Sequence, residues 1–143
     1  MQPADIVMIN SCWRGNIVDA AQWDRFGELF LPDAELDYTQ AGADAVYRGI
    51  TEIQDFFRTA NHPSAHHCVN VYAAERDGIV RVTSKFFAPY TRESHDPKRW
   101  KGGDYLDIVE DTPLGWRFRS RICVARWQFT AGGQSEDVRR RTW

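Results

Sequence analysis

The sequence has few of the features that mark disulfide-rich, nucleic-acid-binding or membrane proteins. Its three cysteines, Cys12, Cys68 and Cys123, are odd in number and have no C-x-x-C spacing, so they predict neither a disulfide framework nor a zinc site. A formal net charge of -2 gives no reason to expect a nucleic acid or an anionic membrane as a partner. No apolar run approaches membrane-spanning length and no secretory leader is recognisable, which favours a cytoplasmic location.

The short motifs of several enzyme classes are also missing. The sequence contains no glycine-rich phosphate loop, no Rossmann fingerprint and no nucleophile elbow. His62, His66 and His67 lack the spacing of a metal site, and His67 and Cys68 are strand neighbours whose side chains diverge, which argues against a Cys/His nucleophilic pair. We therefore expect no metal ion and no organic cofactor.

Aromatic residues, in contrast, are abundant. Six Trp, five Tyr and eight Phe occur in 143 residues, which suits either a lined ligand pocket or an aromatic core. The length fits one domain, because two domains of ordinary size need more residues. We expect this domain to cover residues 1–130 and a C-terminal tail without periodicity to cover residues 131–143.

The first half of the chain has helical periodicity. Apolar spacings of three and four residues predict helices over residues 4–13 and 23–30, the second ended by Pro32. Asp19 precedes the second helix at a position typical of a helix cap. A capping-box pattern that begins at Thr51 predicts a third helix over residues 51–60.

The second half has the alternating pattern of strands. A short strand is expected at Ala34 to Thr39, and Arg76-Asp77-Gly78 has the composition of a hairpin turn. Four long strands are then expected, and their approximate ranges are 64–75, 79–90, 103–110 and 116–129. Helices first and antiparallel strands afterwards predict an α+β fold, in which N-terminal helices pack in a strongly curved, mostly antiparallel sheet that forms a cone with an internal cavity.

Two adjacent histidines begin the first long strand, and only one of them can face the cavity. His67 alternates in phase with Val69 and Val71, which have the character of core residues, so we expect His67 to point inward and His66 outward. An inward histidine held by a carboxylate is a suitable general base near neutral pH. The alternative for His67 is a buried neutral histidine bonded to a backbone carbonyl. The alternative for Asp19 is a helix cap without a catalytic role.

Several segments together resemble the SnoaL-like branch of the nuclear-transport-factor-2-like superfamily, over roughly residues 6–129. They are Asp19 to Phe26, Phe30 to Asp33, Asp37-Tyr38, Gly49, His66 to Asn70, Tyr105 to Asp107, and Gly115 to Arg121. Within this branch the chain is similar to scytalone dehydratase and to the lindane dehydrochlorinase, which use an Asp/His pair to remove a proton from substrate carbon.

The resemblance implies a role for particular residues. The catalytic pair falls on Asp19 and His67, the tyrosine that holds a substrate carbonyl on Tyr38, and the arginine after the Gly-Trp pair on Arg121. Tyr90 occupies the position of the dehydratase's second histidine. The resemblance therefore includes both members of the catalytic Asp/His pair, called the dyad below, whereas the accessory groups differ from those of the dehydratase.

From these residues and this resemblance we expect a lyase or isomerase that acts on a small, apolar cyclic substrate. His67 is the expected base, Asp19 its partner, and Tyr38, Tyr90, Tyr105 and Arg121 the expected substrate-binding residues. Alternatives are a non-catalytic ligand-binding module, a structural subunit like the β subunit of ring-hydroxylating dioxygenases, and a polyketide cyclase or epoxide hydrolase. The family resemblance also implies a homo-oligomer, either a trimer or a dimer.

Overall fold

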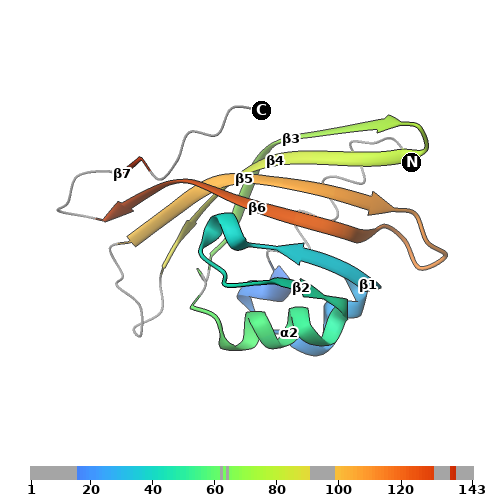
Figure 1. Cartoon of the computed structure of the whole chain (residues 1–143), viewed down its shortest axis with the longest axis horizontal. Coiled ribbons are helices and arrows are strands. Elements are labelled where there is room, and N and C mark those ends of the chain that lie inside the picture. Colours follow the sequence, from blue (N-terminus) through green and yellow to red (C-terminus); the bar gives the residue numbers. More distant parts are fainter. Residues whose placement is uncertain (1–15, 62, 64, 91–98, 131–135, 138–143) are drawn as a thin grey trace.

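The computed structural model describes residues 16–61, 63, 65–90, 99–130 and 136–137. Within them, one mixed sheet has the strand order β2-β1-β6-β5-β4-β3, and β7 pairs with β6 (Figure 1). The strands are β1 (Phe30–Asp37), β2 (Val46–Arg48), β3 (His67–Arg76), β4 (Ile79–Pro89), β5 (Arg99–Glu110), β6 (Arg117–Thr130) and β7 (Glu136–Asp137). Among these, β1 and β6 pair in parallel and the other neighbours are antiparallel.

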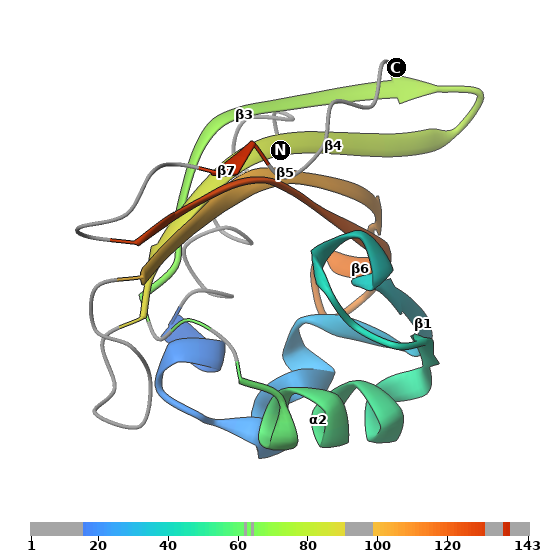
Figure 2. The same ribbon diagram turned by 60° about the vertical axis from the view of Figure 1, so that its left-hand side comes forward.

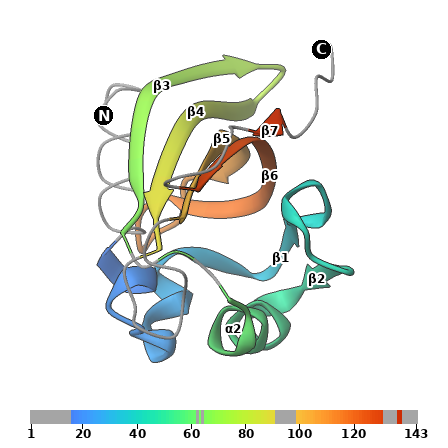
Figure 3. The ribbon, with the colours of Figure 1, turned by 90° about the vertical axis from the view of Figure 1, so that its left-hand side faces the viewer.

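The sheet curves around the helical layer, as Figures 2 and 3 show. This layer contains the helical residues 16–19, the 3₁₀ helix η1 (Trp23–Glu28) and the helix α2 (Gly49–Thr59), whereas the 3₁₀ turn η2 (Thr39–Ala41) lies beside β6. α2 buries Ile53 and Phe57, which lie four residues apart and therefore on one face. The predicted α+β cone is confirmed.

The core has two parts, because apolar residues of the helices and of the inner sheet face gather in two clusters. The larger cluster lies between helices and sheet and contains Ile17, Val18, Phe26, Leu29, Phe30, Ala34, Leu36, Ile53, Phe57, Val82, Val109 and Phe118. The smaller cluster lies on β4, β5 and β6 and contains Phe86, Ala88, Tyr105 and Cys123. The candidate site lies over this second cluster.

The hairpin between β3 and β4 agrees with the prediction from the sequence. Asp77 and Gly78 have φ angles of 54° and 73°, and they join Arg76 directly to Ile79. Two consecutive positive φ angles are what a type I′ turn requires, and Asp-Gly is among its preferred sequences. The turn between β5 and β6 is closed by a hydrogen bond from the Gly115 amide to the Thr112 carbonyl oxygen, 2.8 Å long.

The N-terminal elements differ in part from the prediction. The segment expected to be helical over residues 23–30 is a 3₁₀ helix that ends at Glu28, and Phe30 already begins β1. Pro32 lies inside β1, where the register with β6 shifts between Phe30 and Glu35. Proline has no amide hydrogen to donate, so an irregular stretch of a ladder accommodates it. The helix predicted over residues 4–13 lies outside the described residues.

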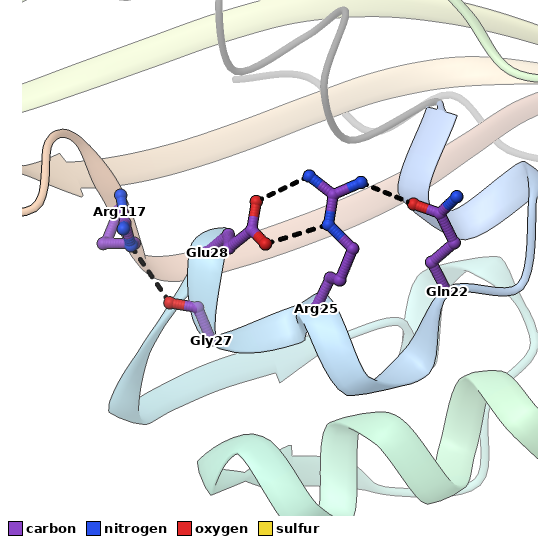
Figure 4. Close-up of polar contacts among 5 residues, drawn as sticks. All are labelled: Gln22, Arg25, Gly27, Glu28 and Arg117. Carbon is purple, nitrogen blue, oxygen red and sulfur yellow. Dashed lines mark hydrogen bonds and ion pairs between the residues drawn. The ribbon is translucent and has the colours of Figure 1, made fainter.

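Polar contacts fix η1 against its surroundings (Figure 4). The Arg25 guanidinium donates two hydrogen bonds to the Glu28 carboxylate, each 2.8 Å long, and one of 2.7 Å to the Gln22 side chain. Arg117 Nε on β6 donates to the Gly27 carbonyl oxygen at 3.0 Å. Gln54 on α2 donates to the Trp23 carbonyl oxygen at 2.6 Å. The segment that carries Asp19 is thus continuous with a helix held from two sides.

Candidate functional site

A cavity of about 560 Å³ lies between α2, the η2 segment and the inner face of β4, β5 and β6. This volume is in the range of small-molecule sites. Aromatic rings and small apolar side chains form most of its wall. The polar side chains that reach it are Tyr38, Asp44, Tyr47, Thr59, Asn61, His66, Tyr90, Lys101 and Tyr105.

His66 lines this cavity and forms a hydrogen-bonded pair with Asp19, which lies behind it and outside the cavity lining. One carboxylate oxygen of Asp19 is 2.5 Å from His66 Nδ1, and the other accepts the His66 backbone N–H at 2.8 Å. The His66 side chain is 8% exposed and that of Asp19 is 21% exposed. An ionised carboxylate accepts but cannot donate, so a neutral imidazole that bonds to one through Nδ1 has its hydrogen there and its lone pair on Nε2.

The structure corrects the choice between the two histidines. His67 is exposed and packs edge-on against Phe87, with ring centres 4.7 Å apart, while Phe87 stacks on the exposed Trp100. His67 therefore lies on the outer face of the sheet, and the expectation that it points into the cavity is wrong. Cys68, its neighbour, packs against the inner cluster.

A β-bulge at Asn70 explains why the alternation was misleading. Asn70 has a φ of 51°, and the register with β4 shifts between Val69 and Tyr72. One extra residue reverses the alternation of side chains along the strand. Val71 packs on the core, as expected, whereas Val69 is 41% exposed. Counting back from Val71 through the bulge therefore assigned the wrong histidine to the inner face.

Asp19 is not a helix cap. It ends the helical turn of residues 16–19, and the chain then reverses through Ala21, whose φ is 54°. The N-cap of η1 is Gln22, which makes no side-chain capping hydrogen bond. The Asp19 carboxylate points instead to the start of β3, 47 residues away in sequence.

The three tyrosines expected at the site all line the cavity. Tyr105 stacks on Phe86 with ring centres 4.4 Å apart and faces Tyr38 at 6.5 Å. Tyr90 follows β4 directly, and its ring lies under the Arg99 guanidinium at 4.9 Å. Burial raises the pKa of Tyr90, an effect that the positive charge of Arg99 reduces. Tyr90 therefore remains a hydroxyl donor at neutral pH.

Arg121 does not line this cavity. Its side chain is 2% exposed and donates two hydrogen bonds, 2.6 and 2.7 Å long, to the equally buried carboxylate of Asp107. The guanidinium carbon lies 4.3 Å from the ring centres of both Tyr105 and Phe118. Arg121 was expected to contact a substrate directly. It contacts instead the ring of Tyr105, which lines the cavity.

Lys101 is a cavity residue that the sequence did not reveal. Residues 91–101 read as a polar connection, but β5 already begins at Arg99. Lys101 has the same parity on β5 as Tyr105, since Gly103 lies between them, and this alternation is the signal that identifies it. Its ammonium group donates to the Ala41 carbonyl oxygen at 2.5 Å.

The arrangement is suited to proton transfer. A neutral histidine with Nδ1 held by a carboxylate presents Nε2 as a base, and the carboxylate stabilises the imidazolium that forms. Asp19 and His66 make the contact that such a pair needs, and His66 lines a cavity that also contains tyrosine hydroxyls. Within the described residues, no three His, Cys, Asp or Glu side chains gather as a metal site would require.

Comparison with known proteins identifies the family and the structures that this chain resembles. The family profile described as the SnoaL-like domain matches residues 12–122. A protein from Kribbella flavida, Kfla4162, is similar in structure with a TM-score of 0.76 and 14% identity, covering 91% of this chain and 95% of its own. A search of curated proteins gave no significant match.

Two further solved structures are informative about the cone. LinA has a TM-score of 0.71 at 14% identity and covers 92% of this chain and 91% of its own. A candidate scytalone dehydratase from Novosphingobium aromaticivorans has a TM-score of 0.67 at 18% identity and covers 99% of this chain and 94% of its own.

In the described part of the chain, no helix is long and apolar enough to cross a membrane.

Proposed function

This chain belongs to the SnoaL-like domain family, and we propose that it is a lyase or isomerase that removes a carbon-bound proton from a small, apolar cyclic substrate. His66 is the base in this proposal and Asp19 is its orienting acid. The observation that supports the assignment is the double contact of the Asp19 carboxylate with the ring and the backbone of His66.

The proposed reaction uses groups already present at the cavity. His66 Nε2 takes the proton, and the electron pair of the broken C–H bond moves toward an adjacent carbonyl or expels a leaving group. Hydroxyl groups of Tyr38, Tyr90 and Tyr105 hydrogen-bond the oxygen on which negative charge develops. The imidazolium then returns the proton to a second carbon in an isomerase, or to the leaving group in a lyase.

Two variants of the dyad test this proposal. Exchange of the acidic C–H of 2-tetralone, a small apolar cyclic ketone, is followed by NMR in deuterated water. Replacing His66 with Ala or Asp19 with Asn is expected to reduce the protein-dependent exchange rate about 10²-fold, the usual size of a general-base contribution.

His67→Ala is a matched control, since it removes a neighbouring histidine from the outer face of the sheet. It is expected to keep the rate within about threefold of wild type. Equal rates in wild type and His66→Ala would refute the dyad and favour a ligand-binding or structural module, the alternative role.

An oligomer, dimer or trimer, remains part of the proposal, because apolar residues such as Val69 and Trp100 are exposed on the sheet.

A further inference from the structure

The end of the cavity at β5 contains a positive charge in mostly apolar surroundings. Among the described residues that line it, Lys101 is the single Lys or Arg, and the one carboxylate, Asp44, is exposed and accepts the Tyr47 hydroxyl at 2.8 Å. Burial lowers the pKa of the Lys101 ammonium, which reflects the free energy that its charge loses away from water. An anionic ligand atom would restore that free energy.

The Lys101 ammonium group is positioned by one hydrogen bond and has further hydrogens that a ligand could accept. Lys101 donates to the Ala41 carbonyl oxygen at the end of η2, and an ammonium group has three hydrogens. Tyr90 and Cys123 line the same cavity. The Tyr90 backbone N–H donates to the Arg99 carbonyl oxygen and Ala88 pairs with Lys101, so Tyr90 and Lys101 are diagonal neighbours on one face of β4 and β5. A ligand oxygen in this corner would accept from an ammonium and a phenol.

The sheet register gives the distance between this corner and the base. His67, the first residue of β3, pairs with Phe87, and Ala88 pairs with Lys101. Continued by one residue, this register places His66 opposite Ala88 and in a row with Lys101. Two strand spacings amount to roughly 10 Å between the outer backbones. His66 and Lys101 both line the cavity, and its volume of about 560 Å³ has room for one small ring.

From this row we infer that Lys101 binds an ionised oxygen of the substrate, and that the substrate is a ring compound with an acidic phenol or enol at the end opposite the C–H that faces His66. This inference rests on the proposed function for the role of His66. It narrows the substrate class from an apolar ring to a ring with one acidic hydroxyl. Lys101 with Tyr90 would stabilise its conjugate base.

Binding of 4-nitrophenol tests the inference without catalysis, because the ionised form has its own visible absorbance. Wild-type protein is expected to bind the phenolate better than the phenol and to lower the apparent pKa of the bound molecule by about 1, a tenfold preference. Lys101→Met is expected to abolish this preference, whereas Lys101→Arg keeps most of it. Lys101→Gln, which keeps a donor but no charge, is expected to behave like Lys101→Met.

The controls separate this inference from the dyad and from misfolding. 4-Nitroanisole has nearly the same shape but no ionisable group, and it is expected to bind wild type and Lys101→Met equally. His66→Ala is expected to retain the phenolate preference, so failure of the dyad would leave this result intact. Phenolate affinity unchanged in Lys101→Met, or a wild-type preference for the neutral phenol, would overturn the inference.

Discussion

At the scale of single residues, the ion pair of Arg121 and Asp107 is buried behind the cavity residue Tyr105. Both side chains are 2% exposed, and the guanidinium is enclosed by the rings of Tyr105 and Phe118. Arg121 Nη1 is buried without a hydrogen-bond partner among the described residues. A charge in this position depends on its one carboxylate, because water cannot replace the partner.

Asp107→Asn is therefore expected to destabilise the protein by about 3–5 kcal/mol, since it leaves the guanidinium charge buried without compensation. Urea unfolding followed by tryptophan fluorescence measures the loss. The matched double variant, Asp107→Leu with Arg121→Met, is expected to regain most of it, because no charge remains to be compensated. A single-variant loss below about 1 kcal/mol would show that the pair is solvated.

At the scale of elements, β6 lies so close to Gly102 and Gly103 of β5 that neither position has room for a Cβ atom. The register shifts between these two glycines, where Trp127 and Ala125 are their partners. A Cβ atom on Gly103 would lie 1.9 Å from the Val124 carbonyl oxygen, a backbone atom that cannot move aside. This bulge bends the two strands next to Lys101 and Cys123.

Gly103→Ala is accordingly expected to cost about 3 kcal/mol or more, because the strands must separate to make room for the methyl group. Gly27→Ala on η1 is the matched control, since its nearest neighbour would be Ile50 Cδ1 at 4.0 Å. The control is expected to change the unfolding free energy by less than about 1 kcal/mol. Equal melting temperatures for the two variants would contradict this account of the bulge.

Elements with strong local signals were predictable, and the orientation of side chains beyond a bulge was not. Asp77-Gly78 identified its hairpin, because the turn type is determined by its own two residues. The choice of His67 depended on regular alternation through Asn70, a residue that nothing in the sequence marks as bulged. Asp19 was identified by the family resemblance, since its contact with His66 spans 47 residues.

At the scale of the whole molecule, an ion network on β4, β5 and β6 crosses the middle of the sheet. The Asp104 carboxylate accepts from Lys85 at 3.0 Å and from Arg126 at 2.7 Å. Burial opposes ionisation of Asp104, but the hydrogen bonds from Arg126 and Lys85 outweigh it and lower its pKa. The three strands are therefore linked by a group that titrates in acid.

The network makes part of the stability pH-dependent. The pKa of Asp104 is lower in the folded chain than the value of about 3.9 expected when unfolded, so its contribution is complete above about pH 5 and disappears as the pH falls through the folded value. Asp104→Asn is expected to lose about 1–2 kcal/mol at pH 7 and to match wild type at low pH. Asp55→Asn, which removes an exposed pair with Arg58, should have little effect at either pH, as urea titrations can check.

The way in which Asp19 contacts His66 has a consequence for motion. One carboxylate holds both the backbone amide and the ring of the same residue, so bending of β3 moves the acid and the base together. The distance between Asp19 and His66 then changes little when the curved sheet fluctuates. Proton transfer at Nε2 would require little reorganisation of the dyad, and ligand entry can deform the cavity wall without uncoupling the pair.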